Sequence, residues 1–349
     1  MAKKSEIESL EIAFRSAQAR LGIAAGLLAR DEWMGLSLSA PAKGSYGMLM
    51  RILRFILGIR SMSRRLTKSY YRLARGLETG YTLDEGGEDT TLKDLRGEFE
   101  DDLEQVRTLN FTWPDMTAEE KYAASEMKKV SAGDKASWNP GELNQSLEDW
   151  LSSIVDKDGK VKGEKFDFIE DRIQDLEDAL KAFRPILGAK GIRNLETKIR
   201  ALKQRYGDDP DRLLAEIENA FLTVRDTLAG SVDKGAVDSG REFLDDIIAK
   251  DKRARLYARG VRSDPCHFCS MLASRGFVYK SQRAALAGAH DNCHCYPIIR
   301  WSDNPDLPER NAYYHRMWPI VTADYDGKDK VKAWRRWIAA QRNKRRGNS

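Results

Sequence analysis

Cysteine and histidine are scarce in this sequence, with 4 of each among 349 residues. Their distribution is uneven, because all four cysteines and three of the four histidines lie between residues 266 and 295. The first residues, Met1–Ile7, run directly into a charged helical pattern and do not resemble a secretory signal. We therefore expect a reducing compartment, which disfavours disulfides and leaves the cluster in need of another explanation.

Long hydrophobic runs are also missing. The most apolar stretch, residues 46–62, is too short to span a bilayer and is interrupted by Arg51, Arg54 and Arg60. Charge of one sign does not dominate either, since 59 basic and 54 acidic residues leave a net charge of +5. Such a mixed surface does not by itself indicate a nucleic-acid partner.

Recognisable catalytic motifs are absent as well. The sequence has no His-Glu-x-x-His motif, no Gly-x-Ser-x-Gly elbow and no convincing Ser/His pair. Paired acids such as Asp101 and Asp102 have the pattern of an ordinary solvated helix surface. We therefore assign no catalytic residue and no small-molecule substrate, and we expect that the protein is not an enzyme.

The cysteine and histidine cluster has the spacing of a structural zinc site. Cys266-x-x-Cys269 supplies one pair of ligands, and the second pair must come from the segment 290–295. His290-x-x-Cys293 gives three cysteines and one histidine, whereas Cys293-x-Cys295 gives four cysteines. We favour Cys266, Cys269 and His290 with either Cys293 or Cys295, and the spare cysteine beside the site.

Two other interpretations of the cluster stay open. A thioredoxin-like redox pair at Cys266 and Cys269 lacks a preceding βαβ pattern and leaves the second group of residues unexplained. A cysteine nucleophile with a histidine base is compatible with the nearby histidines, but it leaves at least two cysteines without a role.

The N-terminal third predicts long amphipathic helices. Apolar residues recur every three or four positions over residues 5–30, and a small-residue linker covers residues 37–45. In the apolar stretch that follows, one stripe fits packing against the chain's own core or against a partner subunit, and a membrane surface is the less favoured alternative. The residues proposed for partner binding are Met48, Ile52, Phe55, Ile56, Ile59, Tyr71, Arg72 and Arg75.

The middle of the chain predicts further helices separated by loops. We expect an acidic loop at residues 82–91, a helix to about Leu109, a capping box at Thr117-x-x-Glu120 and a loop at residues 129–141. Residues 156–164 predict a turn, because glycine and lysines occupy positions that a calcium loop does not allow. Helical patterns follow at residues 165–203 and again from Asp208, so this region resembles a protruding helical hairpin.

The C-terminal third predicts a helix over residues 232–259 and two short strands, Gly276–Tyr279 and Cys295–Trp301, that pair with each other. Trp318, Trp334 and Trp337 are expected to close this small unit. The tail is dense in cations, which suits phosphate contacts as well as an ordinary frayed terminus. The candidate DNA-binding residues are Arg335, Arg336, Arg342, Lys344, Arg345 and Arg346.

Five segments resemble the phage head-morphogenesis family typified by the F protein of phage Mu. They are Ser263-x-Pro-Cys-x-x-Cys269 with His290-x-x-Cys-x-Cys295, the front segment Tyr71–Leu83, and Asn304–Asn311 with Asp324–Lys330. The similarity is closest to the minor capsid proteins of actinobacterial phages, and residues 90–230 carry no motif of that family.

The resemblance implies a structural minor capsid protein in few copies, inside the capsid near the portal vertex and in the host cytoplasm during assembly. Its implied partners are the portal protein, the major capsid protein and packaged double-stranded DNA. Similar phage proteins are often labelled capsid maturation proteases, so a protease or a zinc-dependent nuclease is the alternative. A membrane-surface ejection protein is a third alternative, although we do not expect membrane contact.

Together these observations predict a mainly α-helical protein with a small α+β C-terminal module that a Cys/His zinc site holds together. We expect three regions: an N-terminal helical region (1–90) that binds the portal or capsid, an elongated helical insertion (91–230), and a C-terminal module (231–349) with the basic tail.

Overall fold

The computed structural model describes residues 2–37, 45–109, 155–168, 190–261, 265–279, 285, 295–303 and 305–347. These residues form a mainly helical protein with small sheets, as predicted. The expected capping box at Thr117 and the loop at residues 129–141 lie outside this range. So do most of the linker at residues 37–45 and the helical pattern between residues 169 and 189.

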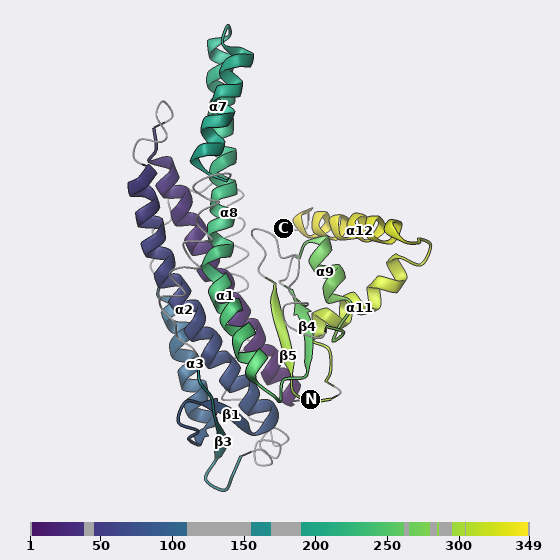
Figure 1. Ribbon diagram of the computed structural model, residues 1–349. Coiled ribbons are helices and arrows are strands. Elements are labelled where there is room, and N and C mark those ends of the chain that lie inside the picture. Colours follow the sequence, from purple (N-terminus) through teal and green to yellow (C-terminus); the bar gives the residue numbers. More distant parts are fainter. Residues whose placement is uncertain are drawn as a thin grey trace.

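Three long helices form the body of the molecule (Figure 1). They are α1 (Ala2–Met34), α2 (Ser45–Thr79) and α8 (Pro210–Lys250), and each packs against the other two. The helix expected over residues 5–30 is therefore confirmed. The close approach of α2 and α8 depends on Gly240, where a Cβ atom would lie 2.3 Å from Ser63 Oγ and 2.9 Å from the Ser63 carbonyl oxygen.

The apolar stripe of α2 lies in this body. Met48, Ile52, Ile56 and Ile59 are buried in the main core cluster, and Phe55 is partly buried against it. The stripe therefore serves as core of this chain, which is the alternative expected of an amphipathic helix in a globular protein. Among the helices in the described ranges, none combines the length and the hydropathy that crossing a bilayer requires.

A short helix and a small sheet cover one end of α2. Helix α3 (Leu92–Arg107) begins at a capping box, in which Thr91 and Asp94 each accept a hydrogen bond from the other's backbone N–H. Strand β1 (Tyr81–Asp84) pairs in parallel with β3 (Lys160–Lys165), and β2 (Thr90–Thr91) pairs with β3 in antiparallel fashion.

The loop and turn expected here were thus only partly right. The acidic residues 82–91 contain two short strands, and the turn at Asp156–Gly159 continues into β3. Asp156 stabilises that turn, since its Oδ1 atom accepts the backbone N–H groups of Asp158 (2.9 Å) and Lys160 (2.8 Å). Charged side chains dominate both segments, so no alternation of apolar residues marked them as strands.

Helix α7 (Ile192–Tyr206) packs along the first half of α8 and forms a helical hairpin with it. Asp209 caps α8 by accepting the N–H of Arg212, and Pro210 occupies the first turn, as the sequence predicted. The tip of the hairpin extends beyond the other helices (Figure 1). The division into three regions stays a prediction, and its boundary at residue 230 falls within the continuous helix α8.

The C-terminal module consists of β4 (Leu256–Gly260), α9 (His267–Ala273), β5 (Tyr296–Arg300), α11 (Glu309–Val321) and α12 (Lys328–Gly347). Two expectations were wrong here. The helix predicted over residues 232–259 ends at Lys250, and residues 256–260 form β4, which pairs with β5. The segment 276–279 contributes only one bridge, Tyr279 to Tyr257, because Gly276 has a φ of 66° and interrupts extended backbone.

Candidate functional site

The first half of the cysteine motif starts helix α9. Cys266 is the N-cap residue with extended backbone, and its Sγ atom accepts the backbone N–H of Cys269 at 3.3 Å. Cys266 is half-buried, whereas Cys269 is buried. The Cys-x-x-Cys spacing therefore places both sulfur atoms at the entry to one helix, where backbone N–H groups favour negative charge on sulfur.

Cys295 reaches the same region through the β4–β5 ladder. The last pair of the ladder joins Gly260 to Tyr296, so Cys295 lies beside Val261, at the point where the chain leaves β4 toward α9. Val261, Cys269 and Cys295 are buried members of one apolar cluster, and Cys266 packs against it. Three of the four predicted thiol ligands therefore belong to one cluster.

Aromatic side chains of the last two helices close this cluster. Trp334 of α12 is fully buried, and its Nε1 group donates to Ser270 Oγ (3.0 Å) and to the His267 carbonyl oxygen (3.1 Å). Its ring lies against Trp337 and Trp318, with centroid distances of 4.8 and 5.2 Å. The prediction that Trp318, Trp334 and Trp337 close the unit is confirmed.

The remaining predicted ligands, His290 and Cys293, lie outside the described residues. Within the residues that are described, no group of three or more histidine, cysteine or acidic side chains is arranged to hold a metal ion. The zinc site therefore stays a prediction from the spacing. His315, the histidine outside the motif, lies on α11 and its Nδ1 atom is 2.8 Å from the Ser274 carbonyl oxygen.

A buried carboxylate joins the module to the helical body. Asp251, at the end of α8, accepts hydrogen bonds from Tyr71 Oη (2.7 Å), Arg75 Nε (2.8 Å) and Trp301 Nε1 (3.0 Å). Burial raises the pKa of Asp251, but the hydrogen bonds from Arg75, Trp301 and the backbone N–H of Arg253 outweigh it and lower that pKa overall. Asp251 is therefore held as a carboxylate at the junction of α2, α8 and β5.

A second buried ion pair lies nearby. Glu11 of α1 accepts a hydrogen bond from Arg300 of β5, and both side chains are almost completely buried. Burial raises the pKa of Glu11 more than the Arg300 guanidinium lowers it. The pair links the first helix of the chain to the last strand of the module, 289 residues away.

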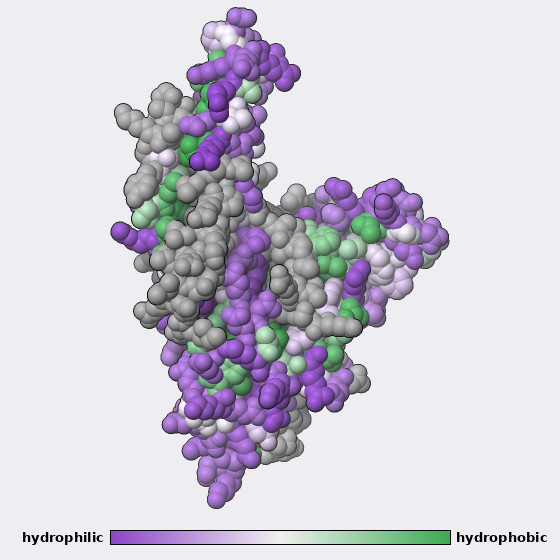
Figure 2. Space-filling view, viewed as in Figure 1, coloured by the Kyte–Doolittle hydropathy of each residue, from purple (hydrophilic) through white to green (hydrophobic). Residues whose placement is uncertain are grey.

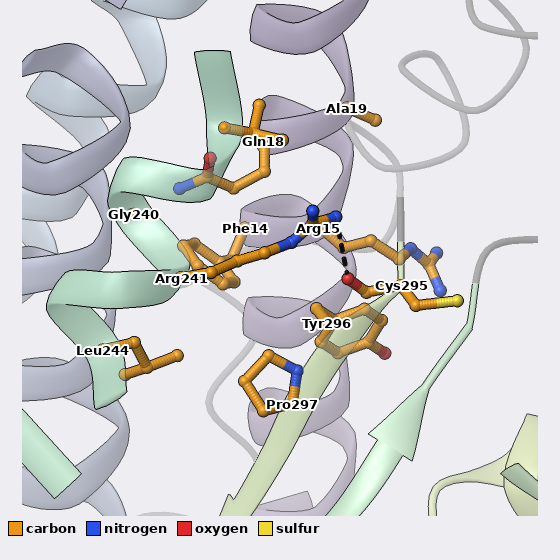
Figure 3. A pocket seen from close by; sticks show the side chains of 11 residues that line it. Phe14, Arg15, Gln18, Ala19, Gly240, Arg241, Leu244, Cys295, Tyr296 and Pro297 are labelled. Carbon is orange, nitrogen blue, oxygen red and sulfur yellow. Dashed lines mark hydrogen bonds between the residues drawn. The ribbon is translucent and has the colours of Figure 1, made fainter. Parts of the chain in front are cut away.

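A small pocket marks the same junction (Figure 3). It lies between α1, α8 and the start of β5, and Arg241 of α8 reaches across to donate to the Cys295 carbonyl oxygen at 3.1 Å. Its lining is Phe14, Arg15, Gln18, Ala19, Val237, Gly240, Arg241, Leu244, Cys295, Tyr296 and Pro297. Mostly apolar contacts and backbone hydrogen bonds make this a packing junction beneath the cysteine segment.

The charged residues proposed for partner binding are used within the chain. Arg72 donates to the Leu83 carbonyl oxygen at 2.8 Å and pairs with Asp84 and Glu98. Arg75 pairs with Asp251 and Glu164, and Tyr71 lies edge-on to Trp301 at 5.2 Å. These side chains therefore hold the fold together, and a role for them in partner binding stays a prediction.

The proposed DNA-binding residues lie on α12. Arg335, Arg336 and Lys344 are exposed, and Arg342 is half-buried. The side chains of Arg345 and Arg346 lie outside the described set. The predicted tail is thus an ordered helix, docked by its tryptophans.

Sequence reasoning missed Asp251, Glu11 and Arg300. Asp251 lies in the run Lys250-Asp-Lys-Arg, which has the pattern of a solvated basic segment. Its partners are 176 and 50 residues away, so no local spacing reveals them. The one available signal was the resemblance of the front segment Tyr71–Leu83, because Tyr71 and Arg75 of this segment bind Asp251.

The described residues thus define a mainly helical protein whose cysteine-containing module is locked to a helical body by buried charges. This chain belongs to the VG15 protein family, a family associated with phages, because the family model matches residues 101–319, more than half of the chain. No curated protein and no solved structure gives a match.

Proposed function

We propose that this chain is a structural minor capsid protein of the MuF-like kind, held on the portal or the inner capsid in few copies during head assembly. Membership of a phage-associated family supports a virion role. In this proposal the chain acts inside the head and in the host cytoplasm before the head is complete, and it carries out no catalysis.

One observation carries the proposal: two segments that resemble the head-morphogenesis family both contact the C-terminal module. Tyr71 and Arg75, from the front segment, bind Asp251 at the edge of the module. Asn311, from the C-terminal segment, donates to the carbonyl oxygens of Arg259 and Ala273, each at 3.0 Å, and thereby joins β4 to α9 at the cysteine motif. The residues that carry the resemblance are therefore used to hold the module together and to join it to the helical body, which supports a shared architecture.

Portal association is tested by co-expressing the chain with the portal protein and, separately, with the major capsid protein of the same phage. We expect the chain to co-elute with the portal oligomer in size-exclusion chromatography and to be present in purified virions by mass spectrometry. Absence from virions would overturn the proposal. Specific cleavage of the major capsid protein on co-expression would replace it with the protease alternative.

We also propose that Cys266, Cys269, His290 and one of Cys293 and Cys295 bind a structural zinc ion. The proposal is supported by the spacing of the motif, by the three thiols that belong to one apolar cluster, and by the backbone N–H that Cys266 Sγ accepts. When bound, a zinc ion with four protein ligands stabilises the module and leaves no open position for water. Cys269 and Cys295, being buried, then hold the ion away from solvent.

The prediction is one zinc per chain in purified protein, measured by elemental analysis. Cys266→Ser and Cys269→Ser are expected to lose the metal and the protection of α9 amides from hydrogen exchange. His267→Gln, in the same motif but outside the ligand set, is the matched control and is expected to keep both. Comparing Cys293→Ser with Cys295→Ser identifies the fourth ligand, and wild-type protein without any metal would contradict the prediction.

A further inference from the structure

Helices α7 and α8 form a hairpin whose outer part extends beyond the other helices (Figure 1). Near the helical body the seam between the two helices is covered, and Leu195, Phe221 and Val224 are buried. Toward the tip the seam side chains are only half-buried; they are Ile199, Leu202, Tyr206, Leu213 and Ile217. Two amphipathic helices cannot enclose their apolar stripes without a further layer, so the outer seam stays partly open to solvent.

Leu214 is the most exposed large apolar side chain of this hairpin, with 55% of its surface open to solvent. It follows the seam residue Leu213, and Lys203 of α7 follows the seam residue Leu202, each by a turn of about 100°. Because α7 and α8 run in opposite directions, these two turns bring Leu214 and Lys203 to the same side of the hairpin. Hydrophobic residues are visible between hydrophilic ones on the projecting part (Figure 2).

The two helices of the hairpin carry opposite charge. Helix α7 contains five basic residues and one acidic residue, whereas residues 210–222 of α8 contain three acidic residues and one basic residue. Arg200 shares a face of α7 with Lys203, and Asp211 and Glu218 share a face of α8 with Leu214, because these residues are spaced by three or four positions. We call these five residues the tip face.

The charges of the tip face are not neutralised by the chain itself. Arg200, Lys203, Asp211 and Glu218 are all exposed, and none of them forms an ion pair with another residue that the structure describes. Further along α8 the situation differs, since Asp226 pairs with Arg30 and Arg225. The tip face therefore presents a basic row and an acidic row beside an exposed leucine.

We propose that the tip face binds the tip face of a second copy of this chain, forming a two-fold symmetric dimer. A two-fold axis that runs along the hairpin places α7 of each copy against α8 of the other, so the basic row of one copy meets the acidic row of its partner. The methylene chains of the basic row then cover Leu214. A partner of a single charge sign would match only one of the two helices, whereas a second copy matches both.

The positions of the charges along the hairpin fit this arrangement. Lys203 and Arg200 lie four and seven residues before Gly207, and Asp211 and Glu218 lie two and nine residues after Asp209. Each basic residue is therefore within about 3 Å, along the helix axis, of the level of an acidic residue. The contact involves about two turns of each helix and is smaller than a standard interface, so we expect a reversible dimer with a dissociation constant of roughly tens of micromolar.

The test is sedimentation velocity of the isolated full chain over a range of about 1 to 500 µM, which spans the dissociation constant expected of a small interface. Arg200→Glu/Lys203→Glu makes both rows acidic, and Asp211→Lys/Glu218→Lys makes both rows basic. Each variant alone is expected to bind itself at least about tenfold more weakly, because each reversed contact occurs twice under the symmetry. An equimolar mixture of the two variants is expected to form dimers again, to within about threefold of the wild-type constant.

Two controls separate the tip face from general effects. Arg335→Glu/Arg336→Glu reverses two exposed charges on α12 and is expected to change the dissociation constant by less than about twofold, as for residues outside an interface. Leu214→Ser is expected to weaken the dimer by roughly tenfold, whereas Ile320→Ser, at a residue of α11 that is 66% exposed, is expected to leave it unchanged. Circular dichroism checks that every variant keeps its helical content.

Three results would overturn the inference. They are a chain that stays monomeric at the highest concentration, losses in the α12 control equal to those in the α7 variant, and a mixture of the two charge variants that does not recover. The inference does not depend on the proposed function, because co-elution with the portal is measured separately and can succeed or fail whichever result is obtained here.

Discussion

Asp251→Ala is expected to lower the free energy of unfolding by about 3–5 kcal/mol, the range for breaking a buried ion pair from one side. The substitution leaves the Arg75 guanidinium buried and removes the acceptor of Tyr71 Oη and Trp301 Nε1. The control is Asp303→Ala, a nearby carboxylate that is 85% exposed and pairs with Arg255 at 3.1 Å. It is expected to change stability by within about 0.5 kcal/mol.

Urea denaturation followed by tryptophan fluorescence measures both variants. If Asp251→Ala costs no more than Asp303→Ala, the buried carboxylate does not hold the module to the helical body. The double variant Asp251→Asn/Arg75→Met keeps similar volume without either charge, and it is expected to recover part of the loss.

The same carboxylate makes stability depend on pH. The pKa of Asp251 is lowered in the folded protein, so the unfolded chain takes up the proton first as the pH falls. Its contribution is complete above the pKa of an unfolded aspartate, about 3.9, and is lost as the pH falls through the lower folded value. Asp251→Asn is therefore expected to lose less stability than wild type between pH 5 and pH 3.

Trp334→Ala is expected to destabilise the C-terminal module by about 3–5 kcal/mol. The change removes a fully buried ring and its contacts with Tyr314, Trp318 and Trp337, and it leaves Ser270 and the His267 carbonyl without their indole donor. Trp334→Phe keeps most of the packing and is expected to lose only about 1–2 kcal/mol.

Hydrogen exchange of α9 and α12 amides measures this effect locally. Tyr325→Ala, at an exposed aromatic position before α12, is the control and is expected to leave exchange nearly unchanged. Unchanged protection of α9 in Trp334→Ala would show that the cysteine segment is held by contacts other than the tryptophan cluster. Loss of protection throughout α1 and α2 would show that the module and the body unfold together.

Sequence predicted the long helices because their signals are local and repeated. The stripe of Met48, Ile52 and Ile56 and the Asp209–Pro210 start of α8 follow directly from helical geometry. Strand β4 was missed because Lys250–Gly260 is rich in cations, and only its pairing with β5 makes Leu256–Gly260 extended. The secondary structure of this segment is therefore set by its pairing with β5, although its local sequence pattern favours a helix.

The sequence indicates the cysteine motif of the candidate site, but it does not indicate the contacts that support that motif. The spacing of Cys266 and Cys269 identified the motif, whereas the roles of the motif and of the basic tail stay predictions. The charged partners that join this module to the body, Asp251 with Arg75 and Glu11 with Arg300, are brought together over 176 and 289 residues of chain. A pattern within a short window contains no information about such pairs.

The length of helix α8 fixes the distance between the two ends of the molecule that it joins. Its 41 residues form one uninterrupted helix of about 60 Å, with the hairpin at one end and Asp251 at the other. The hairpin and Asp251 are therefore held at a fixed separation, since neither end can approach the other without breaking the helix. A binding partner that touches both the hairpin tip and the module must match this length. Each residue inserted into α8 would turn one end by about 100° relative to the other, so the helix sets an angle as well as a distance.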